Sequence, residues 1–171
     1  SEKAAEIMKK ITESGNEFPI GSDMFNSQNS FMIGNRLYIF LMGRGLFEVN
    51  PTTGKFEPIC RDPLCQHKSE EGCPMTEFYR AVVTDGENVF ALHMDYISKI
   101  DPVEGKLIPM CRWKHSPNAM CGVIACDGGY VYFAACASDT TNEIYRMPVE
   151  GGEPEQLSHL NEHIVNFTVS N

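Results

Sequence analysis

The sequence lacks both a long apolar run and a cluster of basic residues. Its longest hydrophobic stretches, such as 37–42, fall far short of the roughly 20 residues that a membrane-spanning helix needs. Lys and Arg number 14 against 23 Asp and Glu, and a net charge of −9 disfavours binding to a phosphate backbone. We therefore expect no transmembrane segment in this chain and no nucleic-acid partner.

Recognisable catalytic motifs are also missing. The sequence contains no G-x-S-x-G, no H-E-x-x-H and no glycine-rich phosphate loop. His93, His159 and His163 have no cysteine or carboxylate at ligand spacing, so we interpret them as surface or core histidines. These absences predict that the chain is not an enzyme.

Helical periodicity is nearly confined to the first fifteen residues. There, Ala4, Ile7, Met8 and Ile11 lie at helical spacing and Gly15 comes next as a stop signal, which predicts a short helix over 1–15. The charges on this segment are mixed, so we expect it to cover an edge of the domain rather than a membrane surface.

The remainder of the chain, 16–171, has a strand-turn-strand pattern that repeats. Aromatic-rich strands at 35–40, 87–92 and 129–134 are each followed by a second strand, a Pro/Gly turn and a short outer strand. The equivalent positions Leu37, Val89 and Val131 recur at intervals of 52 and 42 residues, as in four-stranded propeller blades. A β-sandwich is the rival fold, but sandwiches do not repeat their sequence at this period.

The predicted fold class is all-β, a partial β-propeller with an N-terminal helix. Its blades span about 22–60, 78–111 and 119–158, and a fourth begins at 163–171. Closed propellers have four to eight blades, so we expect the chain to be an excerpt of a longer protein. The alternatives are that it completes a ring as a homo-oligomer, or that its terminal segments complete a fourth blade.

The most specific motif lies between the first two repeats. Cys60, Cys65, His67 and Cys73 form a C-x4-C-x-H-x5-C pattern, a ligand set that suits a tetrahedral structural zinc ion. The alternative is a disulfide such as Cys60 to Cys73 with no metal. Four protein ligands leave no open coordination position, so either form predicts a stapled loop rather than a catalytic site.

A shortened copy of this loop comes after the second repeat, at 111–121. Cys111 and Cys121 could close it with a disulfide, and Cys121 could instead pair across strands with Cys136, because a Gly128-Gly129 turn would set them opposite each other. The only tryptophan, Trp113, lies in this loop and is either a ligand contact or packed over a blade edge. Cys126 is interpreted as a small buried hydrophobic residue.

With the Cys60, Pro63, Cys65, His67 and Cys73 pattern beside the blade repeats, residues 30–170 resemble a family of uncharacterised bacterial propellers. These are TolB-like proteins of unknown function, often secreted or lipid-anchored. The resemblance implies a propeller fold and an extracellular or cell-envelope location, with the signal absent from this chain. It implies no activity.

The sequence leaves three functions open. The leading hypothesis is a non-enzymatic binding or scaffolding module whose propeller loops contact a protein, peptide or glycan. The second is an accessory domain of a carbohydrate- or peptide-active enzyme. The third is a structural protein stapled by zinc or disulfides, in which the cysteine loops respond to metal or redox state.

Overall fold

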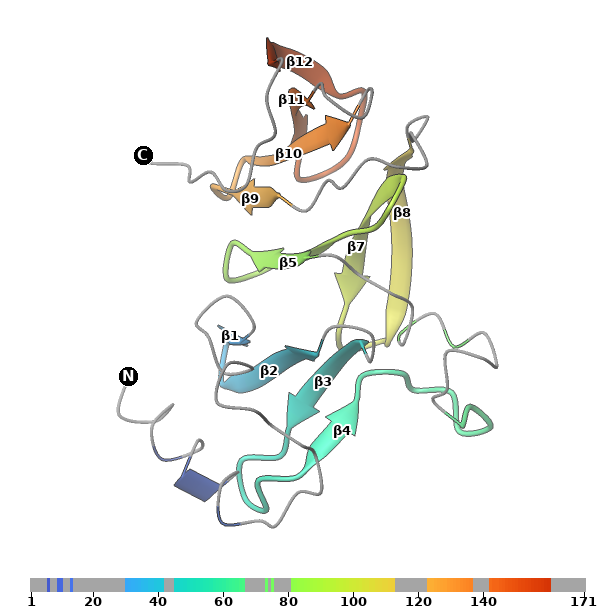
Figure 1. The fold of residues 1–171 in the computed structure, drawn as a ribbon. Helices are drawn as coiled ribbons and strands as arrows, with labels where there is room; N and C mark the ends of the chain where they lie inside the picture. Colours follow the sequence, from blue (N-terminus) through green and yellow to red (C-terminus); the bar gives the residue numbers. More distant parts are fainter. Residues whose placement is uncertain are drawn as a thin grey trace. The chain divides into compact units, whose positions relative to one another are not determined.

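Three separate four-stranded antiparallel sheets make up nearly all of the structure that is described (Figure 1). The computed structural model describes residues 6, 9, 10, 13, 30–41, 45–66, 73, 75, 81–112, 123–136 and 142–160. The chain divides into two compact units, of which the first comprises Ser1–Phe78 with Pro102–Lys106 and the second comprises Tyr79–Asp101 with Leu107–Asn171. The predicted all-β class is confirmed.

The first unit contains one sheet, in the order β1-β2-β3-β4. Its strands are β1 (Ser30–Ile33), β2 (Arg36–Leu41), β3 (Gly45–Val49) and β4 (Phe56–Pro58). Every second residue of β2 joins a buried cluster with two residues of β3, since alternate side chains of a strand point to the same face. The cluster consists of Leu37, Ile39, Leu41, Phe47 and Val49.

The turn between β3 and β4 is explained by its sequence. The Asn50 side chain accepts hydrogen bonds from the N–H groups of Thr52 and Thr53 at 3.0 and 3.1 Å, which folds the chain back after the proline. Gly54 closes the turn at φ 70°, and Gly105 closes the matching turn of the second repeat at φ 64°. Both glycines end a five-residue stretch that starts with Asn-Pro or Asp-Pro, at 50–54 and 101–105, and both adopt the left-handed conformation that glycine favours.

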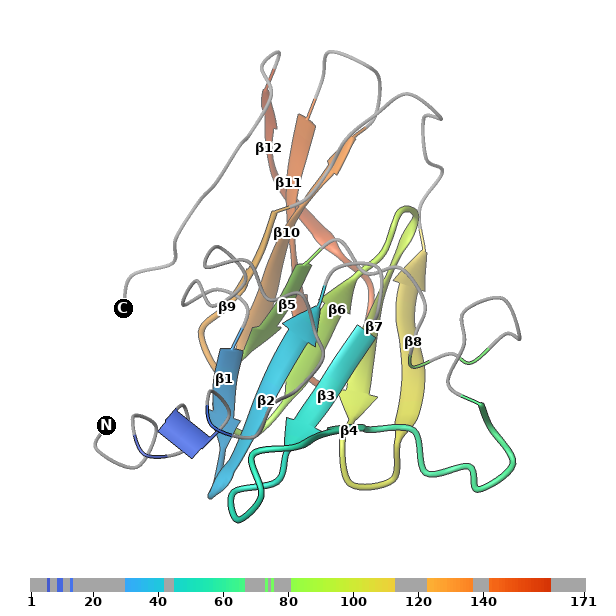
Figure 2. The ribbon, with the colours of Figure 1, turned by 60° about the horizontal axis from the view of Figure 1, so that its bottom comes forward.

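The second unit contains two sheets with the same sequential strand order. One comprises β5 (Ala81–Thr84), β6 (Val89–Leu92), β7 (Tyr96–Asp101) and β8 (Lys106–Arg112), which run side by side in green to yellow in Figure 2. The other comprises β9 (Ile124–Cys126), β10 (Tyr130–Cys136), β11 (Asn142–Pro148) and β12 (Glu155–Leu160). Residues of both sheets share one buried core, which includes Phe90, Ile97, Val131, Phe133 and Met147.

The three positions that the sequence aligns are equivalent in the sheets. Leu37 pairs with Val49 on the next strand, Val89 with Ile100, and Val131 with Met147. Each of them is the first or second residue of the second strand of its sheet. The repeat detected in the sequence is therefore a repeat of strand register, and the three sheets are copies of one structural unit.

The ends of the chain are described only in part. Of the predicted helix at 1–15, Glu6, Lys9, Lys10 and Glu13 have helical backbone, and the remainder lies outside the described residues. The predicted start of a fourth blade at 163–171 also lies outside them. Within the part of the chain that is described, no helix is both long enough and apolar enough to cross a membrane.

Candidate metal centre

Three of the four residues in the predicted zinc motif come together in the first unit. The sulfur atoms of Cys60, Cys65 and Cys73 all lie within 4.8 Å of one another. Cys73 is buried, whereas Cys60 and Cys65 are partly exposed. The fourth predicted ligand, His67, lies outside the described residues.

Cys60 is held through the residue before it. Ile59 is fully buried, and its N–H donates to the carbonyl of Leu46 on β3 at 3.3 Å. This bond fixes the chain at the point where it leaves the sheet, just beyond the end of β4 at Pro58. The backbone position of Cys60 is therefore set by the sheet rather than by the loop.

Cys65 is brought back towards Cys60 by a tight turn that begins at Asp62. The Asp62 carboxylate accepts the N–H of Leu64 at 2.9 Å, and the Asp62 carbonyl accepts the N–H of Cys65 at 3.2 Å. Pro63 suits the second position of such a turn because its ring fixes φ. The x4 spacing between the two cysteines is thus the length of one turn.

The sulfur geometry suits a shared thiophilic ion. In a tetrahedral zinc site with Zn–S bonds of about 2.3 Å, neighbouring sulfurs lie about 3.8 Å apart. The three sulfurs here lie within 4.8 Å of one another, so side-chain movements of about 1 Å or less would bring them to the tetrahedral separation. In this structure no disulfide joins Cys60, Cys65 and Cys73 to one another, and the disulfide between Cys60 and Cys73 stays the alternative to a bound metal.

The cluster opens onto a surface cavity of about 560 Å³. The three cysteines line it together with the cations Arg61 and Lys106 and the anions Asp62 and Glu104. Leu64, which is 90% exposed, lies at its rim. An ion at the cysteines is therefore within reach of solvent from one side.

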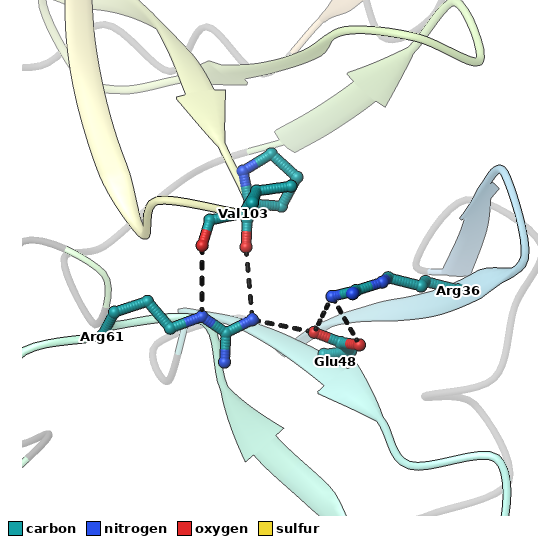
Figure 3. Close-up of polar contacts among 5 residues, drawn as sticks. Arg36, Glu48, Arg61 and Val103 are labelled. Atoms are coloured by element: carbon teal, nitrogen blue, oxygen red, sulfur yellow. Dashed lines mark hydrogen bonds and ion pairs between the residues drawn. The ribbon is translucent and has the colours of Figure 1, made fainter.

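Arg61, the residue after Cys60, contacts two other segments of the first unit. Its guanidinium lies 2.9 Å from the Glu48 carboxylate on β3, which also pairs with Arg36 at 3.2 Å (Figure 3). It also donates to the carbonyls of Pro102 and Val103, each at 3.4 Å. No motif in the sequence signals this network directly, although the repeated Cys-Arg pair after the outer strand points to the position.

No protein-family model and no curated protein matches this chain. Two solved structures that resemble it are variants of the apocarotenoid oxygenase of Synechocystis, with 14% identity each and TM-scores of 0.43 and 0.45. They match 78% and 88% of this chain but only 34% and 37% of their own, so the chain spans about a third of their length. Likeness at this level carries no argument about the fold or the activity.

The other cysteines differ from the cluster in their chemistry. Burial raises the pKa of Cys126 to about 12, with Asp85 and Asp127 adding to the effect. Burial likewise raises the pKa of Cys111 to about 11, with a smaller contribution from Glu153. Both thiols are therefore protonated at neutral pH, and Cys126, interpreted above as a buried residue, is partly buried against the core of the second unit.

The second cysteine loop is largely outside the described residues. This applies to Cys121 and Trp113 and to the side chain of Cys136, while Cys111 is a reduced thiol. The hairpin register that would place Cys121 opposite Cys136 is present, because Asp127 faces Tyr130 and donates its N–H to the carbonyl of Tyr130 at 3.2 Å.

His93 is a core histidine rather than a metal ligand. It is 2% exposed, its Nε2 lies 2.8 Å from the Ser98 hydroxyl, and its ring stacks on Tyr96 at 3.7 Å between centroids. Of the two open interpretations of His93, the structure supports the core position. His163 and the side chain of His159 lie outside the described residues.

Proposed function

We propose that Cys60, Cys65 and Cys73 bind a structural zinc ion that fixes the loop between the first and second repeats. The observation that carries this proposal is the convergence of the three sulfurs within 4.8 Å. Thiolates are soft ligands that select zinc over magnesium or calcium, and three of them at this spacing form most of a tetrahedral shell. The sequence offers His67 as the fourth ligand, two residues after Cys65.

The charged side chains around the cluster balance one another. A zinc ion with three thiolates and one neutral imidazole carries a net charge of −1. Arg61 and Lys106 line the cavity together with Asp62 and Glu104, and Lys106 pairs with Glu104 at 3.4 Å, so the proposal rests on the sulfur geometry and not on these charges. Four protein ligands would leave no coordination position for a substrate, which favours a structural role over a catalytic one.

For the whole chain, we propose a non-enzymatic binding or scaffolding module of the β-propeller type. Three sheets with four sequential strands each and equivalent registers support this, since a propeller blade is such a sheet. The resemblance of the cysteine motif to secreted bacterial propellers supports an extracellular or cell-envelope location. The partner would be a protein, peptide or glycan that contacts the loops, and a glycan array and pull-down that both find no ligand would overturn this part of the proposal.

The metal is tested on the full 171-residue chain purified without chelator. We expect about one zinc per chain by atomic emission, and loss of the zinc in Cys60→Ser and Cys73→Ser. Cys126→Ser is the matched control, because it removes a thiol on β9 that the cluster does not include, and it should retain the metal. A reduced chain that takes up no zinc, or equal loss in the control, would overturn the proposal.

A further inference from the structure

The turn that joins β7 to β8 packs closely against the backbone on both sides of Cys60. A Cβ atom added to Gly105 would lie 2.3 Å from the carbonyl oxygen of Ile59 and 2.8 Å from the backbone nitrogen of Arg61. Separations under about 3 Å do not occur between real atoms of this kind, so only a glycine allows the approach. The turn therefore touches the residues on both sides of Cys60.

Arg61 holds the same turn from its side chain. Its Nε and a terminal nitrogen donate to the carbonyls of Val103 and Pro102, and the guanidinium is held in turn by Glu48 (Figure 3). Glu48 is 17% exposed at its side chain and is itself anchored by Arg36. A planar guanidinium with several fixed donors can bridge a carboxylate and two carbonyls at once, which a lysine ammonium cannot do in the same geometry.

We infer that Gly105 and Arg61 are positioning residues of the metal centre, which fix Cys60 so that its sulfur faces those of Cys65 and Cys73. The inference rests on the proposed zinc site and adds an outer layer to it. Residues that orient metal ligands from behind typically change metal affinity 10- to 100-fold when they are altered. Neither residue is a metal ligand. Gly105 carries no charge, so its effect would act through the position of Cys60, whereas Arg61 also brings a positive charge to the cavity that the cysteines line.

The second repeat lacks this close approach. Cys111 and Arg112 come after β8 residue Met110 as Cys60 and Arg61 come after Ile59, but a Cβ atom added to Gly152, in the turn between β11 and β12, would meet only the Pro148 side chain, at 4.0 Å. Arg112, however, pairs with Asp95 at 3.2 Å and lies over the Tyr96 ring at 5.0 Å. Within the described residues, Arg61 donates to turn carbonyls beside the three clustered thiols, whereas Arg112 makes these other contacts.

Cobalt binding by the full chain tests this inference, because the sulfur-to-cobalt charge-transfer absorption reports thiolate coordination directly. We compare Gly105→Ala and Arg61→Met with two matched controls. Gly34→Ala introduces the same backbone strain at φ +55° with no atom within 4 Å of the new Cβ. Arg146→Met breaks an ion pair to Glu155 at 2.7 Å that involves neither the turn nor the cysteines.

We expect each of the two test variants to bind cobalt roughly 10- to 100-fold more weakly and with an altered charge-transfer band, and both controls to bind as the unaltered chain does. Circular dichroism confirms that each variant is folded. If Gly105→Ala does not fold, Arg61→Lys decides, because it keeps the positive charge beside the cysteines but not the planar set of donors that holds the turn. Unchanged affinity and spectrum in a folded test variant overturn the positioning role while the metal site stands. Absence of cobalt binding by the unaltered chain overturns the proposed metal site itself.

Discussion

Thiol alkylation with and without zinc separates the cysteines of the cluster from the other described cysteines. Cys111 and Cys126 have pKa values raised to about 11 and about 12, from an ordinary value of 9.0. At about pH 8 their thiolate fractions are then lower than that of an unshifted thiol by factors of about 100 and about 1,000. More basic thiolates are intrinsically better nucleophiles, with a Brønsted coefficient of about 0.4–0.5, which offsets part of this difference.

The net expectation is a rate of alkylation about 10-fold lower for Cys111 and about 40-fold lower for Cys126 than for an unshifted thiol. Both rates should rise about tenfold for each pH unit up to the respective pKa, and neither should depend on zinc. Cys60, Cys65 and Cys73 should instead be protected when zinc is bound and react when it is removed by a chelator, because the metal occupies the lone pairs that attack the reagent.

The assay is iodoacetamide labelling of the native chain over a pH series, with peptide mass spectrometry as the readout. Each cysteine is then measured separately, and the urea-unfolded chain supplies the reference rate for an unshifted thiol. Labelling of Cys126 at that reference rate would refute the argument from burial. Labelling of the three clustered cysteines that is indifferent to zinc would refute the metal site.

Two further predictions concern stability. The folded state holds the Cys126 proton more tightly than the unfolded chain does, because the pKa is raised from 9.0 to about 12. The protonated thiol therefore contributes fully to the free energy of unfolding below about pH 9, and this contribution is lost as the pH rises towards about 12. At about pH 10.5 the free energy of unfolding is lower by about 2 kcal/mol. Urea unfolding at about pH 8 and about pH 10.5 should show this loss in the unaltered chain relative to Cys126→Ala, and equal pH dependence in both would contradict it. Phe90→Ala should destabilise the second unit by about 3–5 kcal/mol, because Phe90 is fully buried, whereas Leu64→Ala, at a residue 90% exposed, should change unfolding by less than about 0.5 kcal/mol; similar midpoints for the two variants would contradict the packing described.

The strand repeat could be predicted from the sequence because it depends on residues that are close together in the chain. Alternation of apolar residues places Leu37, Val89 and Val131 on buried faces, and the Pro/Gly turns fix the register of the next strand. The prediction reaches the sheets but not their assembly, because nothing local encodes how one sheet meets the next. The blade interpretation therefore stays a proposal, although the all-β class is confirmed.

The metal cluster could be predicted in part for the same reason. The turn at Asp62 is local, so the x4 spacing between Cys60 and Cys65 was sufficient to indicate that they meet. The contact of Gly105 with the backbone of Ile59 and Arg61 joins segments more than forty residues apart, as the separation of Arg61 from Val103 shows. No spacing rule reaches across such a distance, so the residues behind Cys60 could be found only in the structure.

The Cys-Arg dipeptide has different surroundings in the first two repeats, and the length of the outer strand explains the difference. The segments that end in Cys60 and Cys111 align residue by residue, with a proline two positions before each cysteine. β4 stops at Pro58, whereas β8 runs on through Arg112 and keeps Cys111 within the sheet, where burial raises its pKa. Beyond the end of β4, Cys60 is outside the strand pairing and its side chain faces two other thiols. In the third repeat the aligned residue is Ser158, which offers no soft ligand. Early termination of the outer strand, together with the inserted loop, is therefore what turns a buried repeat position into a candidate metal ligand.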